Sequence, residues 1–471
     1  MALVAGLVWV SVLTRTAGTG GGCLMTRPYA STVRVLENTL RLEASIHRYA
    51  LPAEAALFDA MGTGTDGSID EALAAYQELL ACDQEVLSDT ERRSLQARVG
   101  VLLGESGRLR EARDHVASLS PPGVEGAIAR VMRIAYELPV SGDRRPVGDE
   151  LELLQHLGGG WTVDRLAIRL ARRLGDTDEA AARLRNLDAR GRVRLSRLRA
   201  WAFLQLLLIV PGLAFLFAWV MGMRVRPRVS TGLIPAPWLA TDAVAVLVRG
   251  AFMGIGAFLG VIGLITVVGG VEPDAPGITS GWATAVVMLP AVWLARGRLV
   301  RPHLGAEQGL LEGLGVDPPH RSLPGLAVNA LMPIAGVLIG NILLRRTLWA
   351  IGVQSHYTDV IIEPLLWGGP VDAALISLEV IAWAPILEEV IFRGVVYSTL
   401  RRYMPPAWAV PLSAVLFAAP HMYSLGGTLE VAFSGLIFAL AYERTRSLAP
   451  AIAAHAVANA SVVVGALLLL S

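Results

Sequence analysis

Long apolar runs after residue 200 constrain the fold of this chain more than any other feature. A helix needs about 20 apolar residues to cross the hydrocarbon core of a bilayer, because each residue adds about 1.5 Å along the axis. Several runs approach this length, and short segments that carry arginine separate them. We therefore predict about eight transmembrane helices, which begin near Trp201, Val244, Trp282, Gly325, Val371, Ala407, Leu429 and Leu448.

The composition divides the chain into two regions. Hydrophobic residues make up 54% of the 471 residues, but they concentrate after residue 200, whereas the N-terminal region is rich in Arg, Asp and Glu. We predict an all-α protein in which a polytopic transmembrane helical bundle follows an N-terminal helical, soluble domain. The expected boundaries are 1–25 for a weakly apolar N-terminal segment, 26–199 for the soluble domain, 200–345 for accessory transmembrane helices and 346–471 for the membrane core.

Charge and cysteine content narrow the classes of protein further. The net charge of +1 gives no long-range field that would attract nucleic acid, so no nucleic-acid partner is expected. The two cysteines, Cys23 and Cys82, form no CxxC pair and predict no disulfide framework. The first thirteen residues are too short for a span and lack the basic start of a signal peptide, so we expect at most a weak anchor there.

Three segments of the soluble domain share apolar residues at helical spacing after a glycine-containing turn; they begin at Ile69, Leu109 and Thr177. In the longer run that contains the central segment, SLQARVGVLLGESGRLREARDHVASLSPP, Gly100 and Ala112 lie twelve residues apart, as small residues do where the two helices of a tetratricopeptide unit cross. The copies are unevenly spaced, so the domain is either a degenerate tetratricopeptide-like array or a plain helical bundle. An array would present a face for a protein partner.

Arginines at the ends of the apolar runs indicate which ends face the cytoplasm. Four clusters alternate consistently from the second span onward: Arg224, Arg226 and Arg228; Arg296, Arg298 and Arg301; Arg401 and Arg402; Arg444 and Arg446. By the same count, Arg345, Arg346 and the basic run that begins at Gly191 fall on the opposite side. The alternation of sides from span to span therefore places the soluble domain outside the cytoplasm, whereas the domain's own arginines favour the cytoplasm. We expect the cytoplasmic location, with one span miscounted.

Charged side chains interrupt the apolar run from Trp383 to Gly394, WAPILEEVIFRG. An ionised side chain at bilayer depth costs on the order of 3 kcal/mol on insertion scales. Glu389 and Arg393 are four residues apart in the order that favours pairing, so they can offset each other's desolvation. Glu388 points about 100° away around the helix and has no partner in its own segment. Glu379, earlier in the same run, either lines the same cavity as Glu388 or faces water.

Partners for Glu388 come from two other apolar runs. Among the eight histidines, His421 and His455 lie within such runs; Phe417 is four residues before the first and Asn459 four residues after the second. A spacing of four places both side chains on one helix face. Counted from the arginine clusters, Glu388, His421 and His455 each lie roughly 13–24 Å from the cytoplasmic edge. We predict that they meet in one polar cavity near the middle of the bilayer.

The motifs EExxxR, FxxxH and HxxxN, in this order on separate spans, resemble those of the CAAX prenyl protease and bacteriocin-processing family of intramembrane proteases. The resemblance covers about the last hundred residues and makes 346–471 the protease core. It implies hydrolysis of a peptide bond by an activated water and assigns the catalytic and supporting roles residue by residue. Glu388 and His421 would activate the water, His455 and Asn459 would stabilise the oxyanion, and Glu389, Arg393 and Phe417 would support them.

Alternatives to a cofactor-free, glutamic-type protease come from the same residues. If a metal is present, Glu388, His421 and His455 are its expected ligands, because two histidines and a glutamate are residue types that bind catalytic zinc, although no HExxH motif occurs. A proton-coupled transporter could use the same Glu and His pair. A non-catalytic adaptor would use the helical domain to bind a partner and the spans only as an anchor. We expect the protease, without a cofactor.

The expected setting is the inner membrane of a bacterium. The sequence is rich in Arg, Ala and Gly and poor in Lys, which is typical of a genome with high GC content. The resemblance then implies a multi-pass protein whose partners are the lipid bilayer and a membrane protein or peptide substrate. A further protein partner is expected for the N-terminal helical domain.

Overall fold

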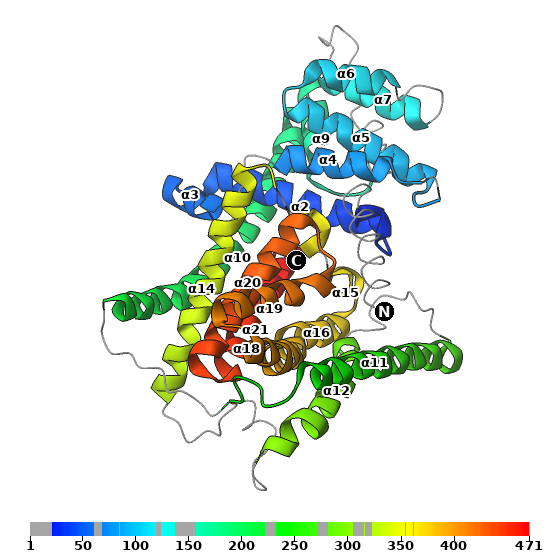
Figure 1. The fold of residues 1–471 in the computed structure, drawn as a ribbon. Helices are drawn as coiled ribbons and strands as arrows, with labels where there is room; N and C mark the ends of the chain where they lie inside the picture. The colour runs from blue at the N-terminus through cyan, green and yellow to red at the C-terminus, as the bar shows by residue number, and fades with distance from the viewer. Residues whose placement is uncertain are drawn as a thin grey trace. The chain divides into compact units, whose positions relative to one another are not determined.

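The computed structural model describes the chain in ranges separated by gaps: residues 21–60, 68–83, 85–118, 124–136, 154, 157–221, 232–270, 281–304, 315, 323–353, 355–360 and 362–470. Every regular element in these ranges is a helix, which confirms the all-α prediction (Figure 1). The chain forms two compact units, Met1–Ala200 with Leu468–Ser471, and Trp201–Leu467. We call them the N-terminal unit and the membrane unit.

The N-terminal unit is a stack of short amphipathic helices in which α4 to α7 each pack against the next, and α5 and α7 pack against α9. A capping box of Ser88 and Glu91 starts α5, which satisfies backbone N–H groups that the helix itself cannot pair. The helices are η1 (Gly21–Leu24), α2 (Pro28–Tyr49), α3 (Pro52–Ala60), α4 (Ser68–Leu80), α5 (Asp89–Glu105), α6 (Leu109–Ser118), α7 (Val124–Tyr136), α9 (Trp161–Arg173) and the N-terminal stretch of α10 (Thr177–Val220).

Small residues lie where these helices cross. Gly100 of α5 faces Met132 of α7 so closely that a Cβ atom would clash with the methionine methyl group. Ala72, Ala112 and Ala180, the equivalent residues of the three sequence segments, are all buried. The close helix crossings therefore depend on these small side chains. Their assignment to a tetratricopeptide-like array stays a prediction.

A buried ionic network ties four helices of this unit together. Glu37 of α2 accepts hydrogen bonds from Arg98 of α5, from the backbone N–H of Thr162 in α9 at 2.8 Å and from the hydroxyl of Tyr76 in α4 at 3.2 Å. Arg98 also donates to the carbonyl of Leu157 at 2.9 Å. Burial disfavours the charge on Arg98, but the adjacent Glu37 carboxylate outweighs that cost and raises the pKa of Arg98 above its usual value.

The two cysteines, for which the sequence predicts no pairing, form a disulfide in the N-terminal unit. Cys23 in η1 and Cys82 after α4 have Cα atoms 5.9 Å apart. The backbone N–H of Gly22 also donates to Glu78 at 3.2 Å, so η1 is fixed to α4 by two kinds of bond. This corrects the prediction from sequence. A separation of 59 residues gives no local signal for the pair.

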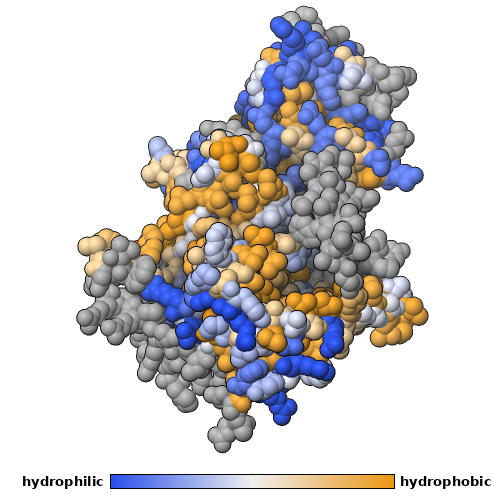
Figure 2. Space-filling model, viewed as in Figure 1, coloured by the Kyte–Doolittle hydropathy of each residue, from blue (hydrophilic) through white to orange (hydrophobic). Residues whose placement is uncertain are grey.

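Within the described ranges, six helices are long and apolar enough to cross a bilayer: Thr177–Phe217, Ala240–Gly269, Ala283–His303, Asn329–Ala350, Leu425–Thr445 and Leu448–Leu468. They belong to α10, α11 (Ala240–Gly269), α12 (Ala283–Ala295) with η2 (Arg296–Val300) and η3 (Arg301–His303), α14 (Leu323–Ala350), α20 (Leu425–Thr445) and α21 (Leu448–Leu470). Large apolar side chains on them are exposed, such as Val267 at 84%. Figure 2 shows much of the visible surface of the membrane unit as hydrophobic, which suits contact with lipid.

The other two predicted spans are broken or short, and they carry the charged and histidine motifs. The first is a helical run from Pro370 to Tyr403, composed of α16 (Pro370–Leu378), η5 (Glu379–Trp383), α17 (Ala384–Glu389), η6 (Val390–Tyr397) and α18 (Ser398–Tyr403). The second is α19 (Pro406–Ala418), which continues as η7 (Ala419–His421). Before them lie the short helices η4 (Tyr357–Val360) and α15 (Glu363–Trp367). These segments build the candidate site.

Candidate active site

Two π-helical segments, η5 and η6, flank the short helix α17 that presents Glu388 and Glu389. Pro385 lies in the first turn of α17 and cannot donate a backbone hydrogen bond to the preceding turn. The wider turn of η5 lies directly before it and absorbs this loss. The result is a helix whose regular hydrogen bonding is relaxed on both sides of the two glutamates.

Glu389 is the central acceptor of the site. Arg393 donates to its Oε1 atom at 2.9 Å, so the pair predicted from the spacing of four is present. Both side chains are fully buried, at 0% exposure. Arg393 also donates to the backbone carbonyl of Gly435 in α20 at 2.8 Å. This ion pair therefore joins the broken helix to its neighbour α20.

His455 of α21 binds the same carboxylate oxygen. Its Nδ1 atom lies 2.9 Å from Oε1 of Glu389, and its Nε2 atom lies 3.8 Å from Oε2 of Glu388. An Nδ1–H that donates to Glu389 fixes the tautomer and turns Nε2 toward Glu388. The sequence did not reveal that Glu389 holds His455, because the two are 66 residues apart. Glu389 thus does more than offset the charge of Arg393.

Glu388 has one oxygen without a protein partner. Its side chain is 15% exposed, and Oε2 is buried without a hydrogen bond to any residue that the structure describes. Buried polar atoms in folded proteins almost always have a partner, so such an atom marks a place where a further donor can bind. The unpaired Glu388 predicted from the sequence is therefore present, with His455 beside it.

Phe417 and His421 complete the cluster from α19 and η7. The Nδ1 atom of His421 lies 3.0 Å from the backbone carbonyl of Phe417, which leaves Nε2 for a second partner. The ring of Phe417 lies 5.2 Å from that of His421 and 5.5 Å from that of His455. The guanidinium of Arg393 lies over the same ring at 4.3 Å. Phe417 therefore packs both histidines against the buried ion pair.

Asn459 lies one helical turn after His455 and contacts the broken helix. Its Nδ2 atom donates to the backbone carbonyl of Val380 in η5 at 2.8 Å. One of its two amide hydrogens is thus engaged by the protein, and the second can serve a ligand. The structure therefore places Asn459 beside the π-helical turn as well as on the His455 face of α21.

Glu379 caps a helix and has no contact with the two histidines. Its buried carboxylate accepts from the backbone N–H groups of Gly281 at 2.8 Å and of Thr284 at 2.7 Å. These groups belong to the start of α12, where an acidic side chain is favoured by the unpaired N–H groups and the helix dipole. The sequence left two possibilities for Glu379: that it lines the cavity with Glu388, or that it faces water. The structure shows neither, because Glu379 is 4% exposed and its carboxylate accepts from the start of α12.

A metal site is not apparent in the arrangement of the side chains. In the ranges that the structure covers, no three His, Cys, Asp or Glu side chains lie close enough together to hold a metal ion. The Nδ1 atoms of His421 and His455 are occupied by Phe417 and Glu389, which leaves only their Nε2 atoms for any ligand. The two Nε2 atoms and Oε2 of Glu388 are therefore the atoms that a bound water or metal ion would contact.

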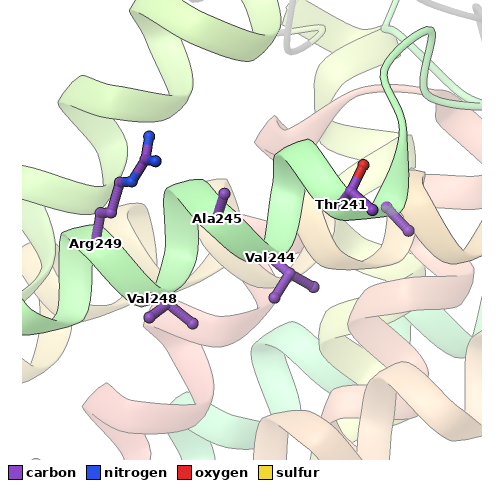
Figure 3. A pocket seen from close by; sticks show the side chains of 6 residues that line it. Thr241, Val244, Ala245, Val248 and Arg249 are labelled. Atoms are coloured by element: carbon purple, nitrogen blue, oxygen red, sulfur yellow. The ribbon is translucent and has the colours of Figure 1, made fainter.

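A hollow of about 510 Å³ lies elsewhere, on α11, and Figure 3 shows its lining. It is formed by Ala240, Thr241, Val244, Ala245, Val248 and Arg249. None of these residues belongs to the cluster around Glu389. The hollow is open and largely apolar and lies on a candidate span, as expected for a surface that faces lipid.

Comparison with known proteins identifies one family. Residues 370–461 match the family described as Type II CAAX prenyl endopeptidase Rce1-like. No curated protein matches the chain, and no solved structure does. The matched segment contains all the motif residues: Glu388, Glu389, Arg393, Phe417, His421, His455 and Asn459.

Proposed function

Because residues 370–461 are an intramembrane endopeptidase domain of the CAAX protease family, we propose that this integral membrane protein cleaves a peptide bond in or near a membrane-associated segment of a protein or peptide by glutamic-type chemistry. The family match favours an enzyme over the transporter and the adaptor considered from the sequence. The observation that best supports the glutamic type is the buried Oε2 atom of Glu388, which has no hydrogen-bond partner among the described residues and lies 3.8 Å from Nε2 of His455.

In the proposed first step, water attacks the carbonyl carbon of the scissile bond. Glu388 accepts a proton from that water, and Nε2 of His421 orients the same molecule. Glu388 suits this role because Arg393 donates to Glu389 instead, and Oε2 of Glu388 has no hydrogen bond to a described residue. The product of the step is a tetrahedral intermediate with a negatively charged oxygen.

In the proposed second step, the amide C–N bond breaks. The second N–H of Asn459 donates to the negatively charged oxygen, and so does Nε2 of His455 once the ring also carries a proton there, since Nδ1–H is already held by Glu389. Both side chains project from one face of α21. The proton that Glu388 holds passes to the departing nitrogen, which leaves as a neutral amine. Glu389 and Arg393 position His455, and Phe417 packs both histidines.

The zinc alternative is tested by removing metal. We expect the purified protein to retain its full cleavage rate after exhaustive chelation, because in the proposed mechanism Glu388 activates the water without a metal ion. The rate is measured before and after chelation, with a known zinc protease as the control for complete removal. A rate that falls on chelation and returns with added zinc would favour the metal mechanism.

The proposed function is tested in membranes, since the substrate is unknown. Cells that contain the native chain are compared with cells that contain His421→Ala at equal protein level. Truncated membrane peptides are expected only with the native chain, because the variant cannot orient the water. Mass spectrometry of membrane fractions detects the peptides and their new termini. Identical peptides in both samples would argue against the assignment.

The proposed setting of the enzyme is the inner membrane of a bacterium. The arginine-rich, lysine-poor composition supports a bacterial source, and the apolar spans support a multi-pass location. The N-terminal unit is proposed to bind a protein partner, on the strength of its stacked helix pairs. The reaction itself is proposed to need no cofactor.

A further inference from the structure

We infer that the N-terminal unit lies on the non-cytoplasmic side of the membrane, in an oxidising compartment. This reverses the cytoplasmic location expected from its arginines. Two independent observations carry the inference: the disulfide within the unit, and the direction in which α10 enters the membrane unit.

The disulfide is the first observation. Cys23 and Cys82 are the only two cysteines in the chain, so every cysteine is paired. Their Cα separation of 5.9 Å is one that a disulfide spans without movement of the backbone. Such bonds persist in oxidising compartments and are rare in the cytoplasm, where thiols are kept reduced. A structural disulfide in this unit therefore points away from the cytoplasm.

The cytoplasmic end of the membrane unit can be recognised from contacts among its loops. Arg402 donates to the carbonyls of Ala236 and Pro237, at 3.1 and 2.8 Å. The hydroxyl of Tyr403 accepts from the backbone N–H of Ala240 at 3.1 Å. These contacts gather the end of α18 and the start of α11 at one end. Leu299 and Val300 of η2 pack with Ala236 and Trp238, and Arg446 lies against Gly232, so these segments share the same end. The described arginines there are Arg296, Arg298, Arg301, Arg401, Arg402, Arg444 and Arg446, and their abundance marks the end as cytoplasmic.

The direction of α10 is the second observation. Leu448 starts α21 at the cytoplasmic end, so Ser461, thirteen residues later, lies about 20 Å from that end. Trp201 donates to the backbone carbonyl of Ser461 at 3.3 Å, and Gln205 donates to its hydroxyl. Ile209, further along α10, shares an apolar cluster with Ala451 and Ala454, nearer the cytoplasmic end. The two helices therefore run antiparallel, and α10 enters from the non-cytoplasmic side.

The arginines that favoured the cytoplasm have partners in the structure. Arg345 pairs with Glu430 at 2.7 Å, at the non-cytoplasmic end. In the basic run that begins at Gly191, Arg199 pairs with Glu54 at 2.7 Å, and Arg190, directly before the run, pairs with Asp164 at 3.0 Å. In addition, arginine counts govern orientation for short loops, whereas a unit of about 200 residues translocates largely regardless of charge. These residues therefore do not hold the unit in the cytoplasm.

This orientation limits the partners of the N-terminal unit to molecules of the non-cytoplasmic compartment. Substrates recruited through the unit are then chains that have already crossed the membrane or expose a segment beyond it. This consequence rests on the proposed protease function, whereas the orientation does not.

The orientation is tested by thiol labelling of the full chain in spheroplasts. The background carries Cys23→Ser and Cys82→Ser, and one cysteine is then introduced at an exposed position. Ser118→Cys reports on the N-terminal unit and Ala407→Cys, at the start of α19, on the cytoplasmic end. A membrane-impermeant maleimide is expected to label Ser118→Cys in intact spheroplasts and Ala407→Cys only after permeabilisation. The reverse pattern would overturn the inference, and labelling after permeabilisation shows that each variant is inserted.

The disulfide is tested separately on the native chain. Cells are denatured with a mass-tagged maleimide present, with and without prior reduction. Both thiols are expected to resist the tag until they are reduced, and Cys23→Ser should expose one thiol that reacts without reduction. Two reactive thiols in the unreduced native chain would contradict the inference. Neither readout depends on cleavage, so failure of the protease proposal is distinguishable from failure of the orientation.

Discussion

Replacing Glu388 by glutamine is expected to lower the cleavage rate by about 10³-fold while the protein stays folded and inserted. Glutamine keeps the shape of the side chain but cannot take a proton from the attacking water. The side chain is 15% exposed and, among the described residues, its one ion pair is the 3.8 Å contact with His455, so the fold loses little when the charge is removed. The turnover number is measured on a peptide found in the membrane comparison, with thermal unfolding as the check on the fold.

The neighbouring residue supplies the matched control. Glu389→Gln removes the partner of Arg393, which is fully buried and stays charged. Stranding one member of a buried ion pair costs about 3–5 kcal/mol, so the protein level and the unfolding temperature should fall. The same variant loosens His455, because Nδ1 loses its carboxylate acceptor. Equal unfolding temperatures for the two variants, or normal turnover in Glu388→Gln, would contradict this division of roles.

The second large effect is expected in the N-terminal unit, from Arg98→Met. The substitution leaves the carboxylate of Glu37 buried without its cation, and the two side chains of the pair are only 2% and 4% exposed. The expected loss of stability is about 3–5 kcal/mol, a large share of the 5–15 kcal/mol that holds a typical domain folded. Resistance of the unit to brief proteolysis in increasing urea, in the full chain, measures the loss.

An ion pair whose arginine is partly exposed provides the comparison for Arg98. Arg165 is 32% exposed and shares Glu105 with Arg169, so Arg165→Met leaves the carboxylate paired. Its expected cost is below about 1 kcal/mol, because Arg165 is partly exposed and Arg169 still balances the buried carboxylate of Glu105. If Arg98→Met and Arg165→Met shift the urea midpoint equally, the buried network does not stabilise the unit as argued.

The sequence predicted what depends on local spacing. About eight spans follow from apolar runs, and six helices meet the length and hydropathy of a span in the described ranges. The pair of Glu389 and Arg393 follows from a separation of four residues on one helix. The motifs also predicted that Glu388 would lack a partner in its own segment, and its Oε2 atom has none. Each of these depends on residues within one or two helical turns.

The features that the sequence missed depend on residues far apart in the chain. The bond from His455 to Glu389 and the cap that Glu379 forms on α12 join separate helices. The disulfide joins Cys23 to Cys82 without a spacing motif. The π-helical turns around α17 were also missed, because a widened turn preserves the apolar character of the run and changes only its hydrogen bonding. Tertiary packing decides all of these.

The shared acceptor Glu389 has a consequence for how a substrate could arrive from the lipid phase. A substrate that enters laterally from the bilayer must pass between two neighbouring helices and separate them. Arg393 of η6 donates a hydrogen bond to Gly435 of α20, and His455 of α21 is hydrogen-bonded to Glu389 of α17. Separating either pair of helices would break buried hydrogen bonds that involve charged groups, and lipid offers no replacement partners. For the proposed protease, we therefore expect a substrate to enter between other helices than these two bonded pairs.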